Sequence, residues 1–156
     1  MISPREPEVP SWSNPDAPAR HRWLPKSEVV DALKLQPRMS IAEIGAGRGD
    51  LILPAAEAIG SAGNGFAVET EPEMLASLRE RSQNSRNIHV VEAPYHPMPF
   101  AAGSCDRVFM ANLWVELAAP IPTLREAAQL LHEDGRLILI ELQAHAEWPH
   151  ARIAFE

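Results

Sequence analysis

Short apolar runs alternate with amphipathic segments along most of the chain. Five runs have the length of buried strands: 40–44, 65–69, 88–91, 107–111 and 136–140. Four segments carry apolar residues at helical spacing: 27–35, 51–59, 72–82 and 123–132. Repeated alternation of strand and helix favours a parallel sheet that is covered on both faces. The pattern therefore predicts a doubly wound α/β domain.

The predicted helices have recognisable ends. The run Thr70-Glu71-Pro72-Glu73 has the form of a capping box with proline in the first turn. Gly135 follows the last periodic residue of the segment 123–132 and would end that helix. Pro54 removes a backbone donor from the segment 51–59 unless the helix begins close to it, so we expect an irregular entry there.

The N-terminal segment differs from the rest of the chain, since five prolines stand within its first 18 residues. Proline fixes φ and lacks an N–H donor, which excludes a continuous helix or a central strand. Trp12 and Trp23 favour packing of this segment against the domain, and a disordered tail is the alternative. We therefore predict an extended arm, 1–25, and a single domain, 26–156.

Length and composition fit one globular domain, with 156 residues of which 46% are hydrophobic. The formal net charge of −7 argues against a nucleic-acid partner, because surfaces that neutralise phosphate are usually basic. The single cysteine, Cys105, indicates a reducing, cytoplasmic setting. The apolar runs are far shorter than the ~20 residues that span a bilayer, so membrane insertion is not expected.

A glycine cluster follows the first predicted strand. Gly45, Gly47 and Gly49 lie between the strand 40–44 and the next helix, the arrangement that brings backbone amides against a bound cofactor. A dinucleotide fingerprint would need glycine at the position of Asp50, which disfavours a nicotinamide cofactor. Glu69 ends the second strand, where a carboxylate can accept hydrogen bonds from ribose hydroxyls of either cofactor class.

Several ordered segments carry a family resemblance. They are Ile41-Ala42-Glu43-Ile44-Gly45-Ala46-Gly47-Arg48-Gly49, Phe66-Ala67-Val68-Glu69, Pro72-Glu73-Met74-Leu75, Met98-Pro99-Phe100, Ser104-Cys105-Asp106-Arg107-Val108, and Leu124-Arg125-Glu126-Ala127 with Gly135-Arg136-Leu137. Together they resemble the class I S-adenosylmethionine-dependent methyltransferases, and within these the small-molecule group related to ubiquinone and menaquinone biosynthesis methyltransferases. The match covers roughly residues 26–142.

The resemblance implies a Rossmann-like sheet in the order 3-2-1-4-5, S-adenosyl-L-methionine as cofactor and a small-molecule methyl acceptor. Backbone around Gly45 to Gly47 would face the methionine part of the cofactor, and Glu69 would face the ribose. Thr70 and Met74 would lie near the adenine, although core packing explains Met74 equally well, and Asn112 would border the donor methyl. The implied cofactor-binding residues are Glu43, Gly45, Ala46, Gly47, Glu69, Thr70, Met74, Glu92 and Asn112.

The sequence departs from the family pattern in two places. Relatives usually hold an acid for the adenine amine where this chain has Pro94, and the nearest carboxylate is Glu92. Relatives also continue after the fifth strand with a helix and two strands, whereas only residues 142–156 remain here, of which 152–156 alternate like one short strand. We therefore expect a C-terminally shortened sheet, with a homodimer covering its exposed edge.

The cofactor of this family supplies an activated methyl group, so the protein mainly aligns the acceptor and excludes water. No catalytic residue is assigned from the sequence. Candidate bases follow the predicted strands, where ligands bind in open α/β sheets: His96 with Tyr95, Glu116 and His145. For each of them an ordinary polar residue is the stronger interpretation, and no metal site is expected.

Three functions are compatible with these patterns. The predicted one is methyl transfer to a small molecule, with the N-terminal arm as a lid. The alternative is a catalytically degenerate S-adenosylmethionine-binding module that acts in assembly or regulation. A nicotinamide-binding Rossmann protein is a third possibility, against which Asp50 counts.

Overall fold

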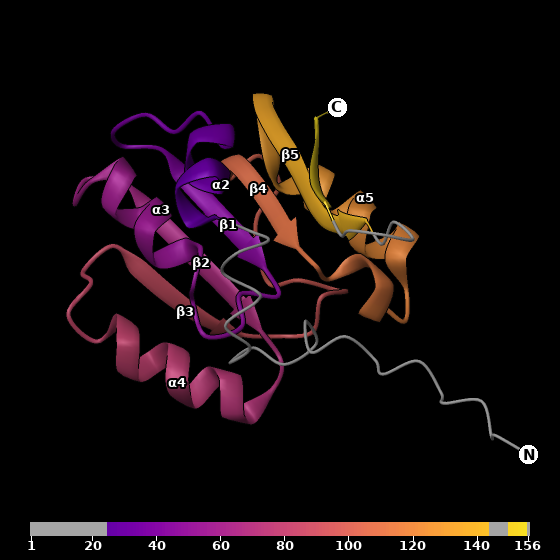
Figure 1. Ribbon diagram of the computed structural model, residues 1–156, viewed down its shortest axis with the longest axis horizontal. Coiled ribbons are helices and arrows are strands. Elements are labelled where there is room, and N and C mark those ends of the chain that lie inside the picture. The colour runs from indigo at the N-terminus through magenta and orange to yellow at the C-terminus, as the bar shows by residue number, and fades with distance from the viewer. Residues whose placement is uncertain (1–24, 144–149, 156) are drawn as a thin grey trace, which may run out of the picture.

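The computed structural model describes residues 25–143 and 150–155 (Figure 1). Its helices are α2 (Lys26–Ala32), α3 (Ile52–Ile59), α4 (Pro72–Ser82) and α5 (Pro120–Leu130), with a 3₁₀ turn η2 (Trp114–Glu116). Its strands are β1 (Ser40–Ile44), β2 (Asn64–Glu69), β3 (Ile88–Glu92), β4 (Cys105–Ala111), β5 (Leu131–Gln143) and β6 (His150–Phe155). The predicted arm, 1–25, falls outside the described residues except for Pro25.

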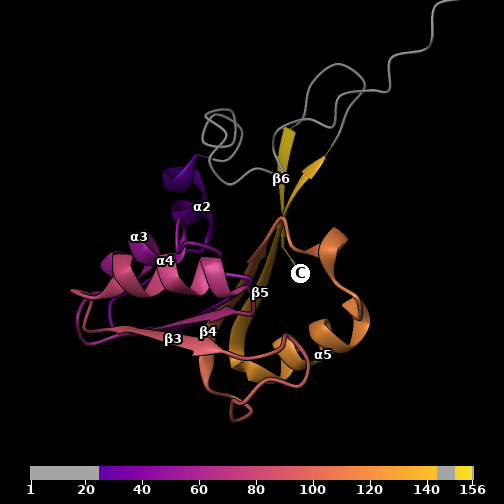
Figure 2. The ribbon, with the colours of Figure 1, turned by 90° about the horizontal axis from the view of Figure 1, so that it is seen from below.

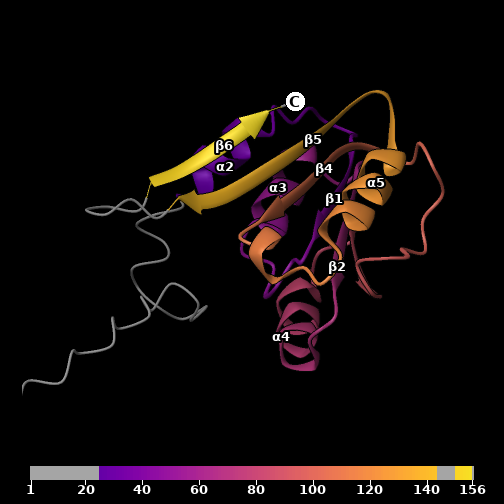
Figure 3. The same cartoon turned by 90° about the vertical axis from the view of Figure 1, so that its right-hand side faces the viewer.

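The strands form a single sheet in the order β3-β2-β1-β4-β5-β6. The first five are parallel, and β6 runs antiparallel to β5, beside which Figure 3 shows it. The predicted order 3-2-1-4-5 and the doubly wound class are confirmed. The alternating segment 152–156 largely coincides with β6, which pairs with Ile138–Gln143 of β5. The sequence predicts an exposed sheet edge at the fifth strand, and β6 of the same chain covers part of that edge.

Helices lie on both faces of the sheet, with α2, α3 and α4 on one side and α5 on the other (Figure 2). Side chains alternate along each strand, so β1 and β4 each contribute to two core clusters. Ile41 and Phe109 belong to the cluster under α2 and α3, which also holds Ile52. Ala42 and Val108 belong to the cluster under α5. Burial on both faces explains why most residues of these two strands are apolar.

Some helix ends differ from the sequence prediction. The predicted capping box is wrong: the N-cap of α4 is Glu71 and no side chain caps it, because the N–H groups of Thr70 and Glu71 donate to Glu69 instead. Helix α5 begins at Pro120. Proline is tolerated there because the N–H groups of a first helical turn have no acceptor within the helix. It ends at Leu130 and β5 follows directly, so Gly135 lies in a strand and does not end the helix.

Pro54 is the third residue of α3, and its missing N–H belongs to the first turn, where no acceptor exists within the helix. The helix therefore begins just before this proline, as the sequence required. Among the residues that the structure describes, no helix is long and apolar enough to cross a membrane.

Candidate functional site

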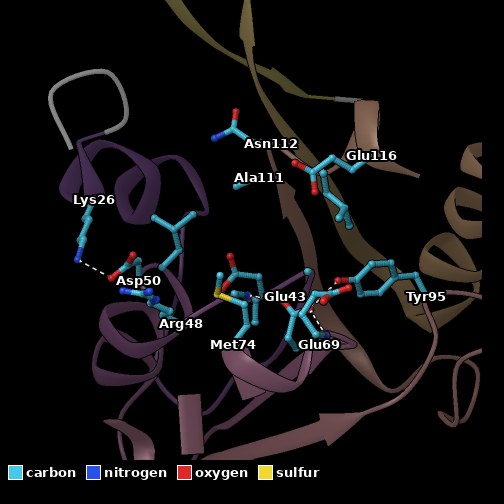
Figure 4. Close-up of a pocket in the computed structure, with 16 residues that line it drawn as sticks. Lys26, Glu43, Arg48, Asp50, Glu69, Met74, Tyr95, Ala111, Asn112 and Glu116 are labelled. Atoms are coloured by element: carbon cyan, nitrogen blue, oxygen red, sulfur yellow. Dashed lines mark hydrogen bonds and ion pairs between the residues drawn. The ribbon is translucent and has the colours of Figure 1, made fainter. Parts of the chain in front are cut away.

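A pocket opens at the carboxyl ends of β1, β2 and β4 (Figure 4). This is the edge at which open parallel sheets bind ligands. Its lining residues are Lys26, Glu43, Gly45, Ala46, Gly47, Arg48, Asp50, Leu51, Glu69, Glu71, Met74, Tyr95, Ala111, Asn112, Leu113 and Glu116. The set combines residues of the loop after β1 with charged side chains from several elements.

The glycine loop between β1 and α3 forms the floor of the pocket and is fixed to the neighbouring strand. The N–H groups of Gly45 and Ala46 both donate to the carbonyl of Val68 on β2, at 2.9 and 3.0 Å. Gly45 has φ +74°, and a Cβ there would lie 2.9 Å from the δ carbons of Leu113. Glycine suits both the positive φ and the close approach of Leu113, so the loop can follow this path between β1 and α3.

Glu69, the last residue of β2, organises the turn beside this loop. Its Oε2 accepts the Gly47 N–H at 2.7 Å, and its Oε1 accepts the N–H groups of Thr70 at 2.7 Å and Glu71 at 3.0 Å. The Tyr95 hydroxyl also donates to Oε1, at 2.9 Å. A carboxylate that is only 3% exposed is thus compensated by four donors. The arrangement joins the glycine loop, the β2 turn and the segment after β3.

Tyr95 and Glu116 face the same side of the pocket (Figure 4). Burial, together with the carboxylates of Glu69 and Glu116, raises the pKa of Tyr95 above its ordinary value despite a hydrogen bond with Thr70. The hydroxyl therefore keeps its proton and donates a hydrogen bond to Glu69. Glu116 lies on η2, whose Trp114 N–H donates to the carboxylate of Glu141 at 2.8 Å.

Charged side chains occupy the other side of the pocket, near α2. Asp50 Oδ1 lies 3.1 Å from Lys26 Nζ and 2.9 Å from an Arg81 guanidinium nitrogen. Partial burial acts to raise the pKa of Asp50, but the bonds from Arg81 and Lys26 outweigh it and lower the pKa. Asp50 therefore remains ionised between two cations.

Glu43 and Asn112 lie at the ends of the two central strands. Glu43 is 3% exposed on β1, and Asn112 follows β4 with φ +54°. The Asn112 N–H donates to the carbonyl of Ile140 on β5, at 2.8 Å. This backbone bond holds a left-handed residue at the pocket wall, a conformation that asparagine tolerates better than most residues.

The pocket gathers seven of the nine residues that the sequence proposed for cofactor binding. They are Glu43, Gly45, Ala46, Gly47, Glu69, Met74 and Asn112. Thr70 lies next to the pocket and contributes its N–H to Glu69. Glu92 pairs with Arg79 at 2.7 Å and its side chain is 62% exposed, so it lies outside the lining. The cofactor roles of all nine stay predictions.

The structure places the candidate bases in different regions. Tyr95 and Glu116 line the pocket, whereas His96 Nδ1 lies 2.7 Å from a carboxylate oxygen of Glu126 on α5. His145 falls outside the described residues. Over the described part of the chain, no group of three His, Cys, Asp or Glu side chains could hold a metal ion.

The sequence did not point to the charged residues beside α2. Arg48 and Asp50 stand inside the glycine motif, and their position there was the available signal. Lys26 gave no signal, because it lies 17 residues before Glu43 and reaches the pocket only through the packing of α2 on α3.

Residues 42–139 match the family model described as a methyltransferase domain. The ubiquinone/menaquinone biosynthesis C-methyltransferase UbiE of Rhizobium johnstonii is 27% identical over 121 residues, which cover 74% of this chain and 47% of that protein. The nocamycin O-methyltransferase of Saccharothrix syringae is 30% identical over 112 residues, covering 70% of this chain and 40% of that protein. The chain thus spans less than half the length of these curated relatives.

Among solved structures, a SAM-dependent methyltransferase from Aquifex aeolicus superposes with a TM-score of 0.76 at 22% identity, covering 86% of this chain and 74% of that chain. The likeness supports the fold, and the family match covers more than half of the sequence. The resemblance drawn from the ordered motifs is confirmed, and the chain belongs to the family of class I S-adenosylmethionine-dependent methyltransferase domains.

Proposed function

We propose that the pocket binds S-adenosyl-L-methionine and that the protein transfers its methyl group to a small molecule. The observation that carries this proposal is the buried Glu69 carboxylate, which lies at the end of β2 and is bonded to the N–H of Gly47 in the glycine loop. An acid in this place can accept hydrogen bonds from both hydroxyls of a ribose, and the adjoining glycine loop lines the pocket beside it.

The pocket residues fit such a cofactor chemically. Glu69 would bind the ribose, Met74 on α4 offers an apolar surface for the adenine, and Asn112 would lie near the donor methyl. When bound, the cofactor would supply the electrophilic methyl group. The protein would bind and orient the two reactants and exclude water. Thr70 supports the site through its N–H bond to Glu69, and Glu92 is proposed to border the adenine from the end of β3.

The relatives support a small-molecule acceptor. Their names describe a C-methyltransferase of quinone biosynthesis and an O-methyltransferase of nocamycin. Both reactions require the acceptor to lose a proton, and Glu116 and Tyr95 are two of the titratable groups that line the pocket opposite Lys26. We propose them as the residues that face the acceptor.

The test is titration calorimetry of the whole chain with S-adenosylmethionine, S-adenosylhomocysteine and NAD. We expect micromolar binding of the first two ligands and none of NAD. Glu69→Ala should abolish the binding, whereas Glu57→Ala, which removes an exposed carboxylate from α3, should leave it unchanged. Equal affinity in native protein and Glu69→Ala would refute the placement of the ribose.

Turnover separates an active enzyme from a binding module. A protein that binds the cofactor and methylates a member of a panel of phenols, enols and amines is the enzyme proposed here. Binding without turnover across such a panel would favour the degenerate module that acts in assembly or regulation.

We also infer a cytoplasmic homodimer that binds no nucleic acid. The single cysteine, which is buried, and the net charge of −7 support the location and the absence of a nucleic-acid partner. Strand β6 pairs only with Ile138–Gln143, so the first half of β5 has no described strand on its outer side. Such an edge favours association with a second copy. Sedimentation velocity should show dimers, and a monomer at all concentrations would contradict the proposal.

A further inference from the structure

The pocket has opposite charge at its two ends. Lys26 and Arg48 lie at the end next to α2, and Glu69 and Tyr95 lie at the other end (Figure 4). The acidic lining residues are Glu43, Asp50, Glu69, Glu71 and Glu116. A ligand with one carboxylate would be repelled from the Glu69 end and attracted towards Lys26. The charge distribution therefore sets the direction in which such a ligand lies.

The basic end is a connected network. Arg81 donates to the carbonyl of Arg48 at 2.8 Å and to Asp50 Oδ1 at 2.9 Å, and Lys26 Nζ donates to the same Asp50 oxygen at 3.1 Å. Two cationic side chains thus contact one carboxylate, so this group of three side chains carries one excess positive charge. Asp50 fixes the ammonium at the pocket wall.

Lys26 retains the capacity to bind an anion. Its ammonium has three N–H donors, and the bond to Asp50 uses one of them. The side chain is 38% exposed, so a ligand in the pocket can reach it. A compact cation of this kind forms strong, charge-assisted hydrogen bonds with carboxylates.

The position of Lys26 in the chain is independent of the family motif. It is the first residue of α2 and precedes the segment 42–139 that the family model matches. Val29 and Leu33 anchor this region in the core cluster that also holds Leu51 and Ile52, so the first turn of α2 lies beside the glycine loop. The family match therefore assigns Lys26 no role.

We propose that Lys26, positioned by Asp50, binds the carboxylate of an α-amino acid group carried by the pocket's adenosine ligand, and that Arg48 adds positive charge to the same subsite. This inference rests on the proposed cofactor, and it identifies Lys26 as the residue that recognises the amino-acid part of that cofactor. Lys26 thereby makes the pocket specific for adenosine with an amino-acid tail over adenosine derivatives that lack one.

The test compares two ligands by titration calorimetry on the whole chain. S-adenosylhomocysteine has the carboxylate, and 5′-methylthioadenosine lacks the amino-acid group. Lys26→Gln should weaken binding of S-adenosylhomocysteine by roughly tenfold, because a charge-assisted hydrogen bond is lost. The affinity for 5′-methylthioadenosine should stay within about twofold of the native value. Lys26→Arg should restore most of the affinity for S-adenosylhomocysteine. Lys34→Gln is the matched control, since it removes the same charge from an exposed position outside the pocket lining.

Two further readouts make the outcome decisive. Circular dichroism of Lys26→Gln should match the native spectrum, and raising the salt concentration should weaken native binding of S-adenosylhomocysteine more than it weakens binding to Lys26→Gln. Equal loss of both ligands, or no loss of either, overturns the assignment of Lys26 while the cofactor proposal stands. A native chain that binds neither ligand overturns the cofactor proposal and this subsite with it.

Discussion

Tyr95 and the proposed ribose of the cofactor compete for the same carboxylate. Oε1 of Glu69 already accepts the Tyr95 hydroxyl at 2.9 Å and two backbone N–H groups, which leaves it little capacity for a ribose hydroxyl. Tyr95→Phe keeps the ring and removes the competing donor. We expect this variant to bind S-adenosylhomocysteine roughly threefold to tenfold more tightly, the range that a net gain of about 0.5–1.5 kcal/mol from one hydrogen bond supplies.

Calorimetry on native protein and Tyr95→Phe measures that gain. Tyr95→Leu is the control for the ring, because it removes both the donor and the ring that packs against the cluster under α5. Weaker binding by Tyr95→Phe would mean that the hydroxyl helps to hold the ligand and does not compete with it.

Residues differ in how well the sequence predicts their place in the site. Glu69 and the glycine loop are predictable, because their positions after consecutive strands bring them together in any sheet of this type. The Glu69 bond to Tyr95 is not predictable, since it depends on the path of the segment after β3. Lys26 is likewise positioned by side-chain packing between helices, which leaves no local trace in the sequence.

Asp106 connects three elements at the opposite end of the sheet. It lies on β4, and its carboxylate accepts the Ser40 N–H at the start of β1 at 2.7 Å and lies 2.6 Å from His132 Nε2 at the start of β5. Partial burial acts to raise the pKa of Asp106, but the bonds from His132 and Ser40 outweigh it and lower the pKa. The ionised carboxylate therefore stabilises the folded state.

Asp106→Asn should lower the free energy of unfolding by about 1–2 kcal/mol at neutral pH, because charge-assisted bonds become neutral ones. A carboxyl whose pKa is lower in the folded state than in the unfolded state stabilises the folded state. This stabilisation is complete above the unfolded-state pKa of about 3.9 and is lost as the pH falls through the folded-state pKa. The difference in the free energy of unfolding between native protein and Asp106→Asn should therefore become smaller below about pH 4. Urea denaturation at pH 6 and pH 3.5 measures it.

Asp134→Asn is the control, since Asp134 is an exposed carboxyl on the same strand as His132. Its free energy of unfolding should stay within about 0.5 kcal/mol of the native value. A difference for Asp106→Asn that stays constant down to pH 3.5 would show that packing, and not charge, carries the effect.

At the scale of elements, the sequence predicts some bounds well and others poorly. Helix α4 has its predicted bounds, whereas β5 spans Leu131–Gln143 and was predicted only over 136–140. Strand β1 has the predicted bounds because four of its five residues are buried, and three of these four are apolar. Helix α5 begins three residues earlier than its periodic pattern, at Pro120, where two prolines obscure the first turn. It ends at Leu130 because β5 begins at the next residue. This end depends on the pairing of β5 in the sheet, which the spacing of apolar residues does not reveal.

For the whole molecule, the order of the five parallel strands is predictable and the pairing of β6 is only partly so. Alternating strands and helices restrict the topology strongly, because crossovers are right-handed and helices must cover both faces. The segment 152–156 has the alternation of a strand, but alternation does not say which strand it joins or in which direction. Its antiparallel pairing with β5 is set by the sheet edge that is left open.

The pocket lies where the two core clusters meet, and this position links ligand binding to global stability. Leu51 and Ala111 of the pocket belong to the cluster under α2 and α3, and Leu113 belongs to the cluster under α5. A ligand should therefore stabilise both clusters together and raise the midpoint of a single thermal transition. At a concentration of about 100 times Kd, the stabilisation is about 2.7 kcal/mol, which shifts the midpoint of a domain of this size by roughly 5–10 °C.

Differential scanning calorimetry with S-adenosylhomocysteine measures this shift, with NAD at the same concentration as the control ligand. Glu69→Ala should show no shift with either ligand, because the proposed ribose contact is gone. A transition that splits in two on binding would contradict the argument, since it would mean that the ligand stabilises one face of the sheet independently of the other. One shifted transition would instead show that the central strands β1 and β4, which contribute side chains to both clusters, transmit the binding free energy through the whole fold.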